Sequence, residues 1–139
     1  MPVPPESGDW RTRLPWPGAG THKHARGRLA VISGPAHRTG AARLAARAGL
    51  RIGAGLVRVM ATSAAIPVLA TSLEAVMVEP FDGADDLGHR LREADAVVIG
   101  PAAGLGEETV SNLHALARTG AVLVVDADAL SVFESHPDD

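Results

Sequence analysis

The sequence predicts an α/β domain with a mostly parallel sheet and helices on both of its faces. Short apolar runs alternate with helical segments from residue 28 onward. The apolar residues are mostly Ala, Val, Leu and Ile, which suit aliphatic packing between a sheet and helices. The 139 residues are 46% hydrophobic, enough for one core. Right-handed crossovers would join consecutive parallel strands.

The first 27 residues differ in composition from the rest of the chain. They hold half of the prolines, Pro2, Pro4, Pro5, Pro15 and Pro17. Proline-rich stretches of this kind are typical of loops and extended segments. We therefore expect a proline-rich N-terminal arm over residues 1–27 and an α/β domain over residues 28–139.

Each element of the domain follows from its own pattern. The β-branched run over residues 29–33 predicts a buried strand, and apolar residues at three- and four-residue spacing predict a helix that starts near Thr39 or Gly40. The same criteria predict strands over residues 56–62, 75–80, 95–101 and 121–125, and helices over residues 64–73, 85–93 and 107–118. A last helix over DALSVFES is expected to be capped by Asp128.

Two of these helices carry predictions about which residues face the core. The first helix is expected to bury the apolar stripe Ala41, Leu44, Ala45, Ala48 and Leu50 and to turn Arg43, Arg47 and Arg51 toward solvent. In the helix over 107–118, the stripe that contains Val110, Leu113 and Ala117 also carries His114, which is therefore expected to be partly buried.

Composition excludes several classes of function. A net charge of -3 and 3% aromatic residues do not favour nucleic-acid binding. The absence of cysteine excludes disulfides and thiolate chemistry and is compatible with a reducing cytoplasm. No apolar run approaches the ~20 residues of a membrane span, and the start MPVPPESGDW lacks the features of a signal peptide. We expect a cytoplasmic protein without a membrane segment.

Three loops are expected at the carboxyl ends of the strands, where open parallel sheets bind ligands. GPAHRTGAA over residues 34–42 would offer backbone N–H groups at a helix start, although its spacing matches neither the phosphate loop nor the dinucleotide fingerprint. GPAAGLGEE over residues 100–108 is a second glycine-rich turn, and DADAL over residues 126–130 brings Asp126 to the rim. Each loop also has a purely structural interpretation as a connecting turn.

The remaining polar residues carry weaker signals. Glu107 and Glu108 are expected to complement the dipole of the helix they begin. Asp126 is either a solvated acid, a partner for a ligand hydroxyl or an indirect support for a metal ion. His22 and His24 would need further ligands to bind a metal and are expected to be solvated. Spacing alone assigns no catalytic triad.

The ordered motifs resemble a known family. HKHARGRLAVISGPAHRTGAARLAARAGLRIGAGLVRV, then ADAVVIGPAAG, then VLVVDADAL are similar to the C-terminal domain of YjeF-type proteins, the ADP- or ATP-dependent NAD(P)H-hydrate dehydratases. The similarity covers roughly residues 22–133. It implies a ribokinase-like fold and a repair lyase, in which nucleotide hydrolysis assisted by Mg²⁺ drives dehydration of the S form of hydrated NADH or NADPH.

The resemblance also implies roles for individual residues. The alanine of the family's Gly-Ala-Ala segment, which contacts the hydrated nucleotide, falls on Ala41, and the third residue of its Gly-Pro-Gly turn falls on Ala102. With the loop residues, the candidate substrate-binding set is Gly40, Ala41, Gly100, Ala102, Gly104 and Asp126. We assign no catalytic residue and no metal ligand.

The family's Thr-Pro-His-Pro-Gly-Glu segment, and the Gly-Thr-Gly-Asp motif that supplies its catalytic base, do not occur here. We therefore expect the N-terminal half of a ribokinase-like domain, weakly active or inactive alone, with a complementary C-terminal half or self-association as ways to cover its open edge. Two alternatives are a non-catalytic nucleotide-binding or oligomerisation module and a small-molecule kinase of the same superfamily, because GAGLV and DADAL are partly shared with such kinases.

Overall fold

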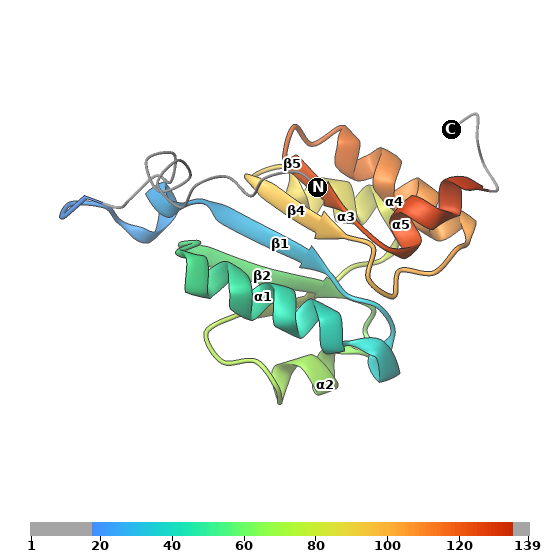
Figure 1. Cartoon of the computed structure of the whole chain (residues 1–139), viewed down its shortest axis with the longest axis horizontal. Coiled ribbons are helices and arrows are strands. Elements are labelled where there is room, and N and C mark those ends of the chain that lie inside the picture. Colours follow the sequence, from blue (N-terminus) through green and yellow to red (C-terminus); the bar gives the residue numbers. More distant parts are fainter. Residues whose placement is uncertain (1–17, 135–139) are drawn as a thin grey trace, which may run out of the picture.

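The predicted strands form one parallel sheet. The computed structural model describes residues 18–134 of the chain. Within them the strands are β1 (Arg28–Ile32), β2 (Leu56–Ala61), β3 (Met77–Pro80), β4 (Ala96–Ile99) and β5 (Val122–Val125). Their order across the sheet is β3-β2-β1-β4-β5, and each neighbouring pair is parallel (Figure 1).

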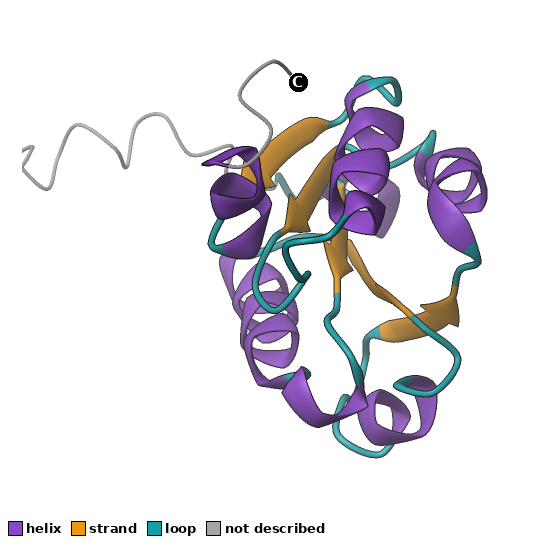
Figure 2. Ribbon diagram, turned by 90° about the vertical axis from the view of Figure 1, so that its right-hand side faces the viewer, coloured by secondary structure: helices purple, strands orange, loops and turns teal. Residues whose placement is uncertain are grey.

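Helices cover both faces of this sheet (Figures 1 and 2). One face carries α1 (Gly40–Ile52) and α2 (Ile66–Ala70), and the other carries α3 (Gly83–Leu91), α4 (Glu107–Ala117) and α5 (Asp128–Ser131). Short 3₁₀ turns lie at Lys23–Arg26, Ala36–Arg38 and Val132–Glu134. The predicted mostly parallel α/β fold is therefore confirmed. The element ends differ from the expected ones by at most three residues, except that the last helix ends at Ser131 and gives way to a 3₁₀ turn.

Alternation along the central strands divides the core into two layers. Val31 of β1 and Val59 of β2 pack with α1 and α2, whereas Ala30 and Ile32 of β1 pack with α3, α4 and α5. At the edge, β5 contributes Leu123 and Val125 to the second layer. Its other face is open, since Val122 is 68% and Val124 50% exposed.

The predicted core face of α1 was right only in part, because Ala45 and Leu50 pack half-buried against the core while the rest of the stripe does not. The helix buries Ala42, Ala46 and Gly49, while Leu44 is 70% exposed. The reason is close packing: a Cβ on Gly49 would overlap the side chain of Leu29 on β1, so only small residues fit against the sheet. The helix still ends as expected, with Gly53 in the left-handed region.

The prediction for His114 was also wrong, because His114 and Ala117 are exposed. The buried face of α4 instead includes Thr109 and Asn112, which pack with Val110, Leu113, Ala115 and Leu116. Of the predicted stripe, Val110 and Leu113 are therefore buried as expected.

Part of the N-terminal arm, residues 1–17, lies outside the described residues. The described part contains the 3₁₀ turn at Lys23–Arg26, where Gly55 fits against the backbone of Lys23. Between residues 18 and 134, no helix is long and apolar enough to cross a membrane.

Candidate functional site

The strand order creates a switch point between β1 and β4. From β1 the chain moves outward to β2 and β3, then returns to β4 beside β1 and continues to β5 on the other side. The loops that leave β1 and β4 therefore run to opposite faces of the sheet, the arrangement at which doubly wound folds bind ligands. Figure 2 looks onto this end of the sheet.

The loop after β1 is held close to the loop after β4. Gly34 is buried, and a Cβ at this position would overlap the carbonyl oxygen and Cβ of Ala102. Beyond it, Thr39 is 4% exposed and precedes Gly40 and Ala41, which are exposed at the start of α1. The first N–H groups of a helix have no partner within it, so this end presents donors to the rim.

The loop after β4 carries three of the candidate residues. Gly100 is buried with φ 138°, and a Cβ there would overlap the carbonyl oxygen of Asp126. Ala102 adopts φ 61° and Gly104 φ 88°, both in the left-handed region. The Ala103 N–H donates to the Gly100 carbonyl at 2.9 Å, which closes the turn. Because Gly100 has no side chain, the loop after β4 can touch the turn after β5.

The turn after β5 places its two carboxylates differently. The backbone N–H of Asp126 donates to the Ile99 carbonyl at 3.1 Å, and its side chain is exposed at the rim, as predicted. Ala127 then takes φ 45° and ψ −121°. This conformation is rare for a residue with a Cβ.

Asp128 is not the helix cap that the sequence predicted. The N-cap of α5 is Ala127, and no side chain caps it. Asp128 is instead the first residue of the helix, and its Oδ2 accepts a hydrogen bond from the Gly104 N–H at 2.9 Å. The turn at Ala127 moves the helix start by one residue, so the carboxylate points across to the loop after β4.

Most of the candidate set is brought together. Gly100 and Asp126 are in backbone contact, and Ala102 lies against the loop after β1. Gly40 and Ala41 reach the same end of the sheet from α1, which covers the opposite face from α4 and α5. A role of these residues in binding substrate stays a prediction.

Three further residues shape this rim and were not in the candidate substrate-binding set. They are Gly34, Thr109 and Asp128. Thr109 is 2% exposed, and its hydroxyl lies 2.9 Å from the Ala103 carbonyl and 2.8 Å from the Gly104 carbonyl. Its position in the first turn after a glycine loop was the one available signal, because threonine there often bonds the preceding backbone.

The other polar candidates occupy ordinary positions. Glu107 and Glu108 lie in the first turn of α4, as expected for acids near a helix dipole. His22 and His24 are exposed, with ring centroids 6.2 Å apart. No three His, Cys, Asp or Glu side chains in residues 18–134 gather as a metal site.

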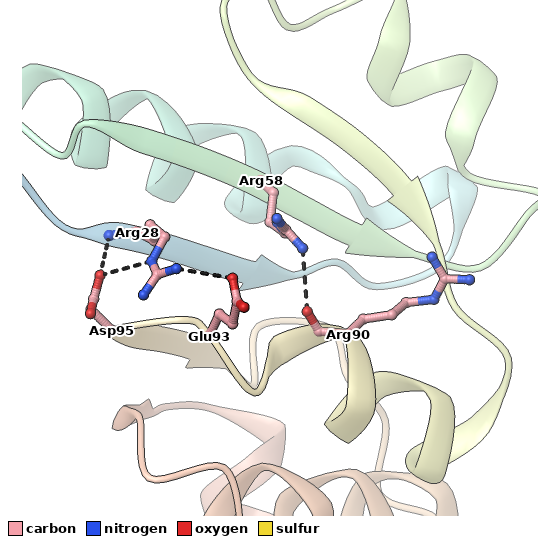
Figure 3. Close-up of polar contacts among 5 residues, drawn as sticks. All are labelled: Arg28, Arg58, Arg90, Glu93 and Asp95. Carbon is pink, nitrogen blue, oxygen red and sulfur yellow. Dashed lines mark hydrogen bonds and ion pairs between the residues drawn. The ribbon is translucent and has the colours of Figure 1, made fainter. Parts of the chain in front are cut away.

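A cavity of about 600 Å³ lies at the opposite, amino ends of the strands. Its rim carries Arg28, Arg58 and Arg90 (Figure 3), together with Arg92. Arg28 pairs with Glu93 at 3.1 Å and Asp95 at 3.4 Å, Arg58 with Glu79 at 3.7 Å, and Arg90 with Asp86 at 2.8 Å. Three of these four arginines thus have a carboxylate partner, and none of the candidate residues lines the cavity.

The parallel sheet with its switch point defines a doubly wound α/β protein, and its likeness to solved structures identifies the fold as ribokinase-like. A ribokinase-like protein of Enterococcus faecalis superimposes with a TM-score of 0.72 at 23% identity, over 88% of this chain and 44% of that one. An ADP/ATP-dependent NAD(P)H-hydrate dehydratase of Bacillus subtilis, co-crystallised with ATP and Mg²⁺, superimposes with a TM-score of 0.70 at 23% identity, over 84% of this chain and 43% of that one.

Within that class, the chain belongs to the NAD(P)H-hydrate dehydratase family, whose model matches residues 29–139. The bifunctional NAD(P)H-hydrate repair enzyme Nnr of Escherichia coli is 39% identical over 85% of this chain and 23% of its own length. The ADP-dependent (S)-NAD(P)H-hydrate dehydratase of Xanthomonas campestris is 34% identical over 84% of this chain and 44% of its own length. The chain therefore spans less than half the length of either relative.

Proposed function

We propose that this chain forms the part of an ADP- or ATP-dependent NAD(P)H-hydrate dehydratase that binds the S form of hydrated NADH or NADPH. The observation that supports it most is the meeting of the three loops at the switch point, where Gly100 and Asp126 touch and Ala102 lies against Gly34. Family membership names the substrate class, and the names of the relatives include ADP- and ATP-dependent enzymes. Zero cysteines accord with a cytoplasmic setting.

The rim is suited to backbone recognition of a small polar ring. Glycines leave room for a ligand to approach the main chain, the start of α1 offers N–H donors, and Asp126 offers a carboxylate that accepts from a hydroxyl or an amide. The hydrated nicotinamide carries both a hydroxyl and a carboxamide. The described residues therefore supply acceptor and donor groups for binding and orientation.

The nucleotide and its Mg²⁺ fit the described residues less well. Mg²⁺ is usually held by one or two carboxylates together with phosphate oxygens and water. Residues 18–134 contain no cluster of three ligating side chains, and Asp126 is the one exposed acid that we identify at this rim. We derive no reaction step through the metal. The Gly-Thr-Gly-Asp motif of the family is also absent from the sequence, so we expect little turnover by these 139 residues alone.

Calorimetric titration with the S form of hydrated NADPH tests the binding role, with NADPH and the R form as controls. We expect saturable binding of the S form and weaker binding of both controls. Binding of all three with equal affinity, or none, would contradict the proposal.

A second assay separates a dehydratase from a non-catalytic binding module. The chain is co-expressed with a polypeptide that carries the family's Gly-Thr-Gly-Asp segment, and the fluorescence of regenerated NADPH is followed with ADP or ATP and Mg²⁺. Turnover by the pair, absent from either chain alone, is the expected result. Binding without turnover by the pair would favour the non-catalytic module.

A further inference from the structure

One side-chain hydrogen bond joins the two loops that carry most of the candidate residues. The Gly104 N–H donates to Asp128 Oδ2 at 2.9 Å, across 24 residues of sequence. The bond is partly buried. Hydrogen bonds to a charged acceptor are stronger than those between neutral groups, and partial burial limits competition from water.

The backbone carbonyls next to this N–H face a side chain of α4. The Gly104 carbonyl lies 2.8 Å from the hydroxyl of Thr109, a residue that is 2% exposed. The Ala103 carbonyl lies 2.9 Å from the same hydroxyl, which donates to one of the two at a time. Asp128 therefore holds the Gly104 N–H, while Thr109 of α4 holds either the Ala103 or the Gly104 carbonyl.

Backbone strain lies on both sides of this bond. Ala102 has φ 61° in one loop, and Ala127 has φ 45° and ψ −121° in the other. Such conformations are strained for residues with a Cβ and persist where surrounding contacts over-determine them, often at ligand clamps. The Ala127 carbonyl accepts from Leu130 N–H at 2.9 Å and Ser131 N–H at 3.0 Å, which holds the turn in place.

We propose that Asp128 is a positioning residue that holds the loop after β4 at a fixed separation from Asp126, and so sets the shape of the rim that receives the hydrated nicotinamide. Asp126 is exposed, whereas Asp128 accepts a hydrogen bond from the loop after β4, so the two acids of this turn have different roles. The effect on ligand binding rests on the proposed function. The effect on Gly104 does not.

The first test measures amide hydrogen exchange at Gly104 by NMR in the 139-residue chain. In the wild type we expect clear protection. Asp128→Ala should speed exchange at Gly104 at least about tenfold, the lower end of what loss of a charged hydrogen bond produces. Asp128→Asn keeps an acceptor oxygen and should restore most of the protection. Asp85→Ala, which removes an exposed acid from α3, should leave Gly104 unchanged.

The second test measures the Kd for the S form of hydrated NADPH in the same variants. Asp128→Ala should weaken binding about tenfold, while Asp128→Asn and Asp85→Ala should stay within about twofold of wild type. An unprotected Gly104 amide in the wild type overturns the proposal, and this readout needs no variant to fold. Exchange that is equal in Asp128→Ala and Asp85→Ala overturns it too. If the wild type binds no ligand, the proposed function fails while the exchange data still decide the loop contact.

Discussion

The two ends of the sheet are held together by different kinds of contact. At the amino ends, long charged side chains pair across the cavity rim, as Arg28 does with Glu93 and Asp95. At the carboxyl ends, the loops meet through backbone, as Gly100 does with Asp126. Exposed ion pairs contribute little and tolerate change, whereas backbone contact leaves no room for a side chain. In this protein, the arginine-rimmed cavity therefore indicates the ligand site less well than the glycine-rich loops at the opposite end of the sheet.

The largest expected effect comes from adding a methyl group where the loops meet. Gly100→Ala would place a Cβ on the Asp126 carbonyl oxygen, so we expect the free energy of unfolding in urea to fall by about 3 kcal/mol or more. Gly104→Ala is the matched control, because its φ is also positive but no atom lies within 4 Å of the new Cβ. It should cost only about 1–2 kcal/mol. Equal losses in the two variants would show that the loops do not touch.

The opposite substitution should stabilise the rim. Ala102→Gly removes the Cβ from a left-handed residue and should raise the free energy of unfolding by about 0.5–1 kcal/mol. Ala103→Gly, next to it but without a positive φ, should lower the same quantity by a similar amount. Urea unfolding of both variants measures whether the free energy of unfolding rises or falls. A lower value for Ala102→Gly than for the wild type would argue against strain at this position.

At the amino ends, loss of an ion pair should matter less. Arg28→Ala removes the contacts to Glu93 and Asp95, and its side chain is 38% exposed. We expect a loss of about 0.2–1 kcal/mol at low salt that shrinks at high ionic strength. Arg51→Ala, on an exposed position of α1, serves as the control and should show no such salt dependence. A large loss in the free energy of unfolding that is insensitive to salt would contradict the view that the amino ends are held by weak, exposed ion pairs.

The smallest effect concerns the acidity of Asp86. The hydrogen bond from Arg90, and then that from the Asp82 N–H, lower the pKa of this carboxyl below its ordinary value. A lowered pKa in the folded state means that its contribution to stability is present above the unfolded pKa and is lost as pH falls through the folded pKa. An NMR titration should give a midpoint below that of the same residue in Arg90→Gln. Identical midpoints would exclude the Arg90 contact as the cause.

Strand and helix positions followed from the sequence because their patterns are local. Burial of the helix faces followed only in part, since apolar residues cover most of α1 outside its arginine side and alanines alone do not indicate which face is packed. The close contact between Gly49 and Leu29 decided that question, and it depends on how near the helix lies to the sheet.

The candidate site likewise has features that the sequence predicted and features that depend on the folded backbone. Glycine-rich loops at strand ends predicted where the rim lies, because parallel strands bring their carboxyl ends to one edge. The role of Asp128 was missed because it depends on the unusual backbone of Ala127, which no pattern of residue types indicates.

The position of β1 between β2 and β4 also bears on how the chain folds. Its register with β2 joins residues 28 apart, such as Arg28 and Leu56, but its register with β4 joins residues 67 apart, such as Leu29 and Ala96. Pairings over longer stretches close larger loops and form more slowly. On the ribosome, the edge of β1 that faces β4 therefore stays unpaired after β2 has emerged and until residue 98 has emerged. Synthesis of residues 62–98 takes about 2–7 s at typical rates of about 5–20 residues per second. During that interval β2 pairs with the other edge of the central strand, and α1 is available to cover one of its faces.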